Sequence, residues 1–229
     1  MSRSMREPEV IHEDNHLVVI DKPPLLATMG AEPGQPTLVQ WTRDWLKTKY
    51  NKPGNVYLGV VSRLDAFTCG LIVLAKTSKA AARLTKQFQA GEVKKRYTAV
   101  VAGESLESSG RFVDWVCKND QRRRMEIVDQ KMAGAKRAEL TWRLIGQHGS
   151  QSLVEVDLLT GRKHQIRVQF ASRGMPILGD RKYDSRIDFE PGIALQASYL
   201  SLIHPVQKVE LEFHLKPPKA WKLNRFTRD

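Results

Sequence analysis

The sequence lacks several features that would place it in a special class of protein. Only two of its 229 residues are cysteine, Cys69 and Cys117, and they stand in unrelated sequence contexts. This excludes a disulfide-stapled scaffold and fits free thiols in a reducing cytoplasm. No window approaches the roughly 18 apolar residues of a membrane-spanning helix, and residues 1–8 lack the apolar core of a signal peptide. We therefore expect a cytoplasmic protein with no membrane partner.

Several motifs of metal and nucleotide sites are also missing. The six histidines form no HxE arrangement, and the sequence has no CxxC pair, so we expect no metal site. It has neither a GxxxxGK[ST] loop nor a GxGxxG turn to cradle phosphates, and no GxSxG nucleophile elbow. We therefore expect no organic cofactor.

The charge balance predicts a polyanionic partner. Lysine and arginine number 37 against 25 aspartate and glutamate residues, which gives a formal net charge of +12. Phosphate groups favour such a chain because binding releases their condensed counterions. The densest basic runs are 94–96, 122–124 and 216–228, although each run is also typical of an ordinary solvated face.

Apolar periodicity predicts strands with helices inserted between them, which is an α+β fold. Strands are expected at 10–14, 17–21, 71–75, 95–101, 154–158 and 209–213, with helices at 37–50 and from Thr77 or Ser78 to Gly91. The segment 161–174 fits both periods, and its length between two glycines favours a helix.

Two segments carry residues suited to chemistry. In the first, Arg63 and Asp65 precede the apolar strand 71–75, which places a carboxylate in a loop at the edge of the core. Asp65 could equally cap a turn or pair with Arg63. The second segment, 159–167, mixes small, basic and polar residues in a way that suits an anion or RNA contact, or a solvated helix start. Spacing alone therefore indicates a polyanion-binding protein with one notable carboxylate.

Together these segments resemble the RluA-like family of RNA pseudouridine synthases. The family pattern H-R-L-D-x-x-T-S-G-L-x-x-x-A-K-T corresponds to 62–77, and T-G-R-x-H-Q-I-R-V-H corresponds to 160–169. The pattern H-P-I-L-G-D-x-x-Y corresponds to 175–183, K-x-Y-x-A-x-V to the strand around Tyr97, and N-K-P to the segment 20–23. The resemblance runs in order from about Val10 to Pro218.

The resemblance implies a fold and a domain organisation. The expected fold has a central, largely antiparallel mixed sheet flanked by helices and loops, in one catalytic domain over 10–218 with terminal extensions at 1–9 and 219–229. No S4-type RNA-binding domain is expected before it. Ser62, Cys69 and Gln169 depart from the family pattern, where histidine, serine and histidine are usual. Ser62 stands close enough to Asp65 in sequence to alter RNA contacts or rate.

The resemblance also implies which residues carry out the reaction. Asp65 corresponds to the essential carboxylate, which acts either as a nucleophile or as a base on the sugar. Arg167 is expected to be its cationic partner, and a solvated or phosphate-binding arginine is the alternative. Tyr97 is expected to stack on the target base and to assist proton transfer from C5, unless it is an ordinary buried strand residue.

Three further residues are expected to hold the RNA. Arg63 resembles the arginine that fills the space left by the flipped nucleotide, because a guanidinium plane can replace lost stacking. A contact with phosphate alone is the alternative for Arg63. Arg162 and His164 are assigned to RNA contact within the second segment.

The implied function is isomerisation of specific uridines in structured RNA, ribosomal or transfer, to pseudouridine. The C1′–N1 bond is cleaved, the base turns, and it rejoins through C5, without metal or cofactor. RNA is the expected partner of a monomeric enzyme. An inactive RNA-binding or ribosome-assembly protein of the same fold is the alternative. A hydrolase would need a second carboxylate or a metal, and no partner for Asp65 stands out.

Overall fold

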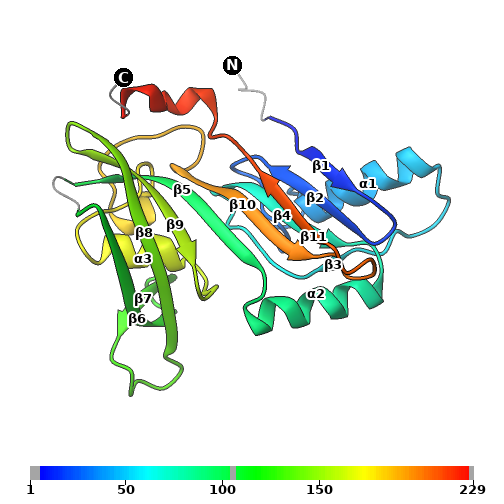
Figure 1. Cartoon of the computed structure of the whole chain (residues 1–229), viewed down its shortest axis with the longest axis horizontal. Coiled ribbons are helices and arrows are strands. Elements are labelled where there is room, and N and C mark those ends of the chain that lie inside the picture. Colours follow the sequence, from blue (N-terminus) through cyan, green and yellow to red (C-terminus); the bar gives the residue numbers. More distant parts are fainter. Residues whose placement is uncertain (1–5, 104–106, 227–229) are drawn as a thin grey trace. The chain divides into compact units, whose positions relative to one another are not determined.

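Strands with inserted helices, as expected from the sequence, make up the computed structural model, which describes residues 6–103 and 107–226 (Figure 1). The chain divides into two units. Unit 1 comprises residues 6–94 and Tyr199–Leu215, and unit 2 comprises 95–198 and 216–226. The predicted extensions 1–9 and 219–229 lie partly outside the described residues, at 1–5 and 227–229.

Unit 1 is built on a sheet in the order β1-β2-β4-β10, with β3 paired to β4 and β11 paired to β10. Its elements are β1 (Glu9–Glu13), β2 (Leu17–Lys22), α1 (Leu38–Tyr50), β3 (Gly59–Val60), β4 (Cys69–Ala75), α2 (Ser78–Ala90), the last residues of β10 (Leu195–Ile203), and β11 (Glu210–His214). The strands and both helices predicted in this region are therefore confirmed.

Both faces of the unit 1 sheet are covered. Val19 and Val73 belong to the apolar cluster that contains Leu84 of α2, whereas Ile20 and Ile72 belong to the cluster that contains α1 residues. Successive strand residues point to opposite faces, so a strand covered on both sides must be apolar throughout. This explains the continuous apolar runs that made β2 and β4 predictable.

The strand order in unit 2 is β10-β5-β9-β8-β6-β7. Its elements are β5 (Lys94–Ala102), β6 (Ser109–Asn119), β7 (Arg124–Val128), β8 (Lys136–His148), β9 (Gln151–Leu158), α3 (Gln165–Ala171), the start of β10, and short 3-10 turns at Arg181–Tyr183, Lys219–Trp221 and Leu223–Arg225. Strands β6, β7, β8 and β10 were not expected from the apolar pattern of the sequence. Pairs β5–β9, β9–β8, β8–β6 and β6–β7 are antiparallel.

Helix α3 packs on one face of the unit 2 sheet, where the Phe170 ring lies 5.1 Å from Phe112 and 6.3 Å from Trp142. The helical interpretation of 161–174 is thus confirmed, over a shorter span. Tyr97 is paired with Val156, and Val156 with Trp142. Because directly paired residues point to the same face, Tyr97 lies on the face that α3 covers.

Among the described residues, no helix is both long and apolar enough to span a membrane. Cys69 and Cys117 are free thiols.

Candidate active site

Asp65 lies in the loop that joins β3 to β4 in unit 1. Its carbonyl oxygen accepts a hydrogen bond from the Thr68 N–H at 3.1 Å, which closes a tight turn just before β4. The Asp65 side chain is half-buried, whereas Arg63, two residues earlier, is exposed. The loop therefore presents a carboxylate and a guanidinium on either side of Leu64.

Lys22, at the end of β2, holds this loop in place. Its side chain is 0% exposed. Its ammonium donates to the carbonyl oxygens of Pro23 at 2.9 Å, Leu26 at 2.8 Å and Ala66 at 3.2 Å. All three ammonium donors therefore have an acceptor, as burial requires. One of those acceptors is the backbone of the residue that follows Asp65.

Thr28 provides a second attachment for the same loop. Its hydroxyl donates to the Leu64 carbonyl at 2.9 Å and accepts from the Leu64 N–H at 3.1 Å. Leu64 and Ala66 flank Asp65, so the carboxylate stands on backbone that is held on both sides. A group held in this way loses little conformational freedom when substrate binds.

Burial governs the ionisation of the groups around Lys22. It lowers the pKa of Lys22 to about 8, although the negative charge of Asp65 opposes the shift. It also raises the pKa of the Cys69 thiol to about 11. Cys69 is therefore a small neutral group at pH 7, and in that respect it resembles the serine of the family pattern.

Arg167 lies on α3 in unit 2 and is 3% exposed. Its guanidinium binds the Asp180 carboxylate through two hydrogen bonds, from Nε at 2.6 Å and from Nη2 at 2.9 Å. The guanidinium carbon also lies 5.1 Å from the centre of the Tyr183 ring. A bidentate pair of this kind fixes the plane of the guanidinium.

His164 and Arg162 occupy the loop before α3. The Tyr183 hydroxyl accepts from the Met125 N–H at 3.0 Å and lies 2.8 Å from His164 Nδ1. The contact between the Tyr183 hydroxyl and Nδ1 orients the imidazole. Arg162 is exposed, and its Nε donates to the Arg137 carbonyl at 2.9 Å. The loop thus holds one oriented ring and one anchored guanidinium.

Gly161 of this loop lies close to the ammonium of Lys95. A Cβ at Gly161 would lie 3.1 Å from Lys95 Nζ, so a larger residue would crowd the ammonium. Burial lowers the pKa of Lys95. The neighbouring Thr160 hydroxyl donates to Gln165 Oε1 at 2.7 Å, and the Arg162 N–H donates to the same oxygen at 2.9 Å. Gln165 therefore closes the loop onto the start of α3.

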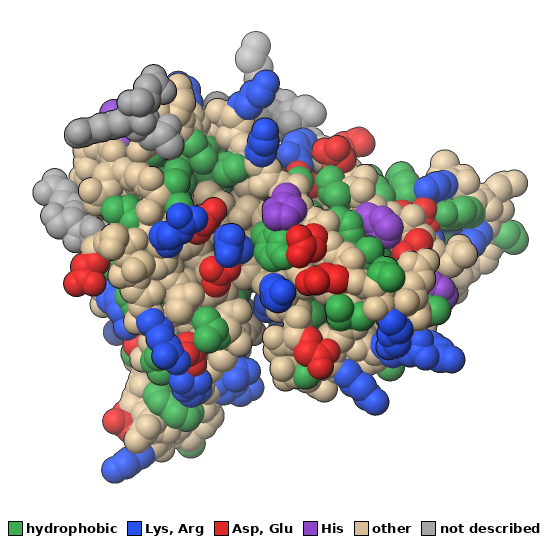
Figure 2. All heavy atoms as spheres, in the orientation of Figure 1, with side chains coloured by type: hydrophobic (Ala, Val, Ile, Leu, Met, Phe, Trp, Pro, Cys, Tyr) green, Lys and Arg blue, Asp and Glu red, His purple; other side chains and the backbone are tan. Residues whose placement is uncertain are grey.

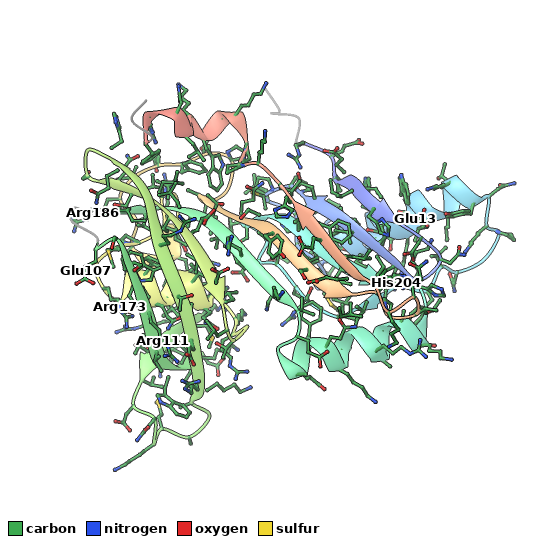
Figure 3. The ribbon with its side chains drawn as sticks, in the orientation of Figure 1. Glu13, Glu107, Arg111, Arg173, Arg186 and His204 are labelled. Atoms are coloured by element: carbon green, nitrogen blue, oxygen red, sulfur yellow. The ribbon has the colours of Figure 1, made fainter. Side chains whose placement is uncertain are left out.

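Strands β6–β8 carry many basic side chains, with acidic side chains among them (Figure 2). Arg111 of β6, labelled in Figure 3, donates from Nε to the buried Glu139 carboxylate of β8 at 2.8 Å. Arg122 and Arg124 lie 3.2 and 3.4 Å from Glu126. An RNA contact by the run 122–124 stays a prediction.

The six residues singled out in the sequence fall into two groups. Arg63 and Asp65 share the β3–β4 loop of unit 1, and Arg162, His164 and Arg167 share the α3 segment of unit 2. Tyr97, on β5, is 8% exposed and lies on the α3 face. Their roles stay predictions. Among residues 6–103 and 107–226, no cluster of three or more His, Cys, Asp or Glu side chains is arranged to hold a metal ion.

The sequence patterns assigned no role to Lys22, Asp180 or Tyr183. Each stood inside a segment that matched the family pattern, at 20–23 or 175–183, so a signal was present. What the pattern could not supply was the pairing with Ala66, Arg167 and His164, because these residues lie in other segments of the sequence.

Comparison with known proteins gives a consistent result. Residues 16–172 match the family model described as RNA pseudouridylate synthase. The ribosomal large subunit pseudouridine synthase D of Pseudomonas aeruginosa is 33% identical over 97% of this chain and 73% of its own length. The dual-specificity RNA pseudouridine synthase RluA of Haemophilus influenzae is 32% identical over 91% of this chain and 92% of its own length.

A solved structure agrees with these matches. The human RNA pseudouridylate synthase domain containing 4 aligns with a TM-score of 0.77 at 26% identity, and covers 94% of this chain and 92% of its own. The expected fold, family and enzyme class are therefore confirmed. This chain belongs to the RNA pseudouridylate synthase family.

Proposed function

We propose that this pseudouridine synthase isomerises specific uridines in structured ribosomal or transfer RNA. The observation that carries the proposal is the family motif around Asp65, in a loop that Lys22 and Thr28 hold on both sides of the carboxylate. The choice of RNA is supported by the relatives, one named for the large ribosomal subunit and one for dual specificity.

Asp65 is proposed as the essential carboxylate. Carboxylates serve as nucleophiles at sugar carbons in other enzymes, and as bases when the proton lies within reach. In this isomerisation the C1′–N1 bond breaks, a C1′–C5 bond forms, and the proton on C5 is lost while N1 gains one. Atoms and electrons balance within the RNA, so the reaction consumes no second substrate.

Tyr97 and Arg167 are proposed to act in the same reaction. Tyr97 would stack on the target base and assist removal of the C5 proton. Arg167 would be the cationic partner of the Asp65 carboxylate. Support comes from the pair with Asp180, which fixes the guanidinium plane of Arg167, since a pre-oriented charge stabilises an anion at lower cost than a mobile one.

Arg63, Arg162 and His164 are proposed to bind the RNA. Arg63 would fill the space of the flipped uridine, and its exposure leaves the guanidinium accessible. The excess of 37 lysines and arginines over 25 acidic residues supports a phosphate-dominated contact. We further propose a cytoplasmic monomer, and sedimentation velocity of the protein with and without RNA tests the oligomeric state.

The test of substrate choice is pseudouridine mapping in cells that lack this protein. Carbodiimide modification followed by primer extension would cover ribosomal and transfer RNA from these cells. Supply of the wild-type protein should restore pseudouridine at specific positions, and Asp65→Asn should restore none. Asp44→Asn, at an exposed carboxylate on α1, is the matched control. An unchanged map in all four samples would contradict the proposed substrates.

A further inference from the structure

The loop that carries Asp65 also exposes an aromatic ring. The Phe67 side chain is 49% exposed, although phenylalanine is among the residues most often buried. Among the described residues Phe67 makes no contact with another ring, and it belongs to neither apolar cluster of unit 1. About half of the Phe67 side chain is therefore accessible to a ligand.

The ring is presented on backbone that is fixed. Ala66, on one side of Phe67, is tied to Lys22, and Thr68, on the other side, is buried and closes the turn onto Asp65. A ring on such a backbone loses little freedom on binding. Two more exposed apolar side chains, Leu25 at 44% and Met29 at 48%, stand on the segment tied to this loop through Lys22 and Thr28.

The surroundings of the ring indicate its ligand. Arg63 is exposed on the same loop, so a cation and a flat apolar face stand on either side of Asp65. Guanidinium planes and aromatic faces are the two kinds of side chain on which unpaired RNA bases stack. In the family pattern the position of Phe67 is unspecified, which favours a role in substrate choice over a role in the isomerisation itself.

We propose that Phe67 stacks on an unpaired base next to the reacting uridine and so selects RNA in which that neighbour is single-stranded. This inference rests on the proposed function, because it takes the RNA to approach the Asp65 loop. It adds a specificity-determining residue to those already assigned.

The experiment compares two labelled probes by fluorescence anisotropy: a 12-nucleotide oligouridine and a 12-unit ribose–phosphate chain without bases. Both carry the same phosphates, so their difference in affinity measures contact with bases. The wild-type protein should bind oligouridine more tightly than the abasic chain. Phe67→Ala should weaken that preference about tenfold, from the usual magnitude of base stacking on one aromatic ring, while its affinity for the abasic chain is unchanged.

Two further variants separate stacking from bulk. Phe67→Tyr keeps the ring and should keep the full preference, whereas Phe67→Leu keeps apolar volume without a π face and should weaken the preference as Phe67→Ala does. Val206→Ala, at an exposed apolar residue of unit 1, is the control and should bind both probes like wild type. Equal affinity of the wild-type protein for the two probes, or a full preference in Phe67→Leu, would overturn the inference. Failure of the proposed function is seen separately, as absence of pseudouridine formation by the wild-type protein.

Discussion

Lys22 combines complete burial with a charge, and its hydrogen bonds hold the loop of Asp65. Burial lowers its pKa from 10.5 to about 8 in the folded protein. Below pH 8 the lysine is protonated in both folded and unfolded chains, so its contribution to stability does not vary with pH. Between pH 8 and 10.5 the unfolded chain binds more protons, so stability must rise with pH in this window.

This gives a prediction for Lys22→Met, which removes the titrating group. From pH 8 to pH 10 the free energy of unfolding of the wild-type protein should rise by about 2 kcal/mol relative to the variant. Urea denaturation of both proteins at the two pH values measures the difference, and the titrating groups that do not interact with Lys22 cancel. A relative change of zero, or a fall, would contradict the burial of a charged Lys22.

The buried pair Arg167–Asp180 has a surface counterpart in Arg181–Asp188, with N–O distances of 2.6 and 2.7 Å. The side chains are 3% and 2% exposed in the first pair and 79% and 77% in the second. Asp180→Asn should therefore destabilise the protein by roughly 3–5 kcal/mol, and Asp188→Asn by less than about 1 kcal/mol. Similar losses in thermal or urea unfolding would show that burial does not set the strength of these pairs.

At the scale of elements, the stability of helix α2 depends on the residue that caps its N-terminus. The sequence left Thr77 and Ser78 as alternative caps, and the structure assigns Thr77, whose side chain accepts from the Ala80 N–H. Thr77→Ala should cost about 1 kcal/mol of stability, whereas Ser78→Ala, one residue inside the helix, should change it by a few tenths. Urea denaturation of the two variants distinguishes the caps. Equal losses of stability in the two variants would contradict the assignment of Thr77 as the cap.

The strands also show which elements can be predicted from the sequence. Strands β2 and β4 were predictable because both of their faces are buried. The sequence of strand β8 does alternate, since Ala138, Leu140 and Trp142 stand between polar residues and are buried. This strand was nevertheless not predicted. In β10, by contrast, Gln196 and Ser198 are buried beside apolar residues, so neither strict alternation nor a continuous apolar run was present.

The candidate site was predictable only where one segment holds the whole pattern. The Asp65 motif and the loop before α3 are both local in sequence, and both were found. The bonds from Lys22 to Ala66 and from Arg167 to Asp180 join residues 44 and 13 positions apart. Such pairings depend on tertiary packing, which periodicity and composition do not reveal.

For the whole molecule, the net charge of +12 predicts a strong salt dependence of RNA binding. The logarithm of the association constant should fall linearly with the logarithm of salt concentration. Arg162→Gln should reduce the magnitude of that slope by about 0.7–0.9, which corresponds to one phosphate contact. Arg181→Gln, whose side chain pairs with Asp188, is the control. An unchanged slope in Arg162→Gln would remove this residue from the RNA-binding surface.

The central claim is that this chain isomerises uridine with Asp65 as its essential carboxylate. Tritium release from RNA that carries 5-tritiated uridine tests it most directly, because the base cannot rejoin through C5 without loss of the hydrogen at that carbon. The substrate should be bulk RNA from cells that lack this protein. Release by the wild-type protein and by Asp44→Asn, with none from Asp65→Asn at equal RNA affinity, is the predicted result. Release that persists in Asp65→Asn, or no release from a wild-type protein that binds this RNA tightly, would contradict the account.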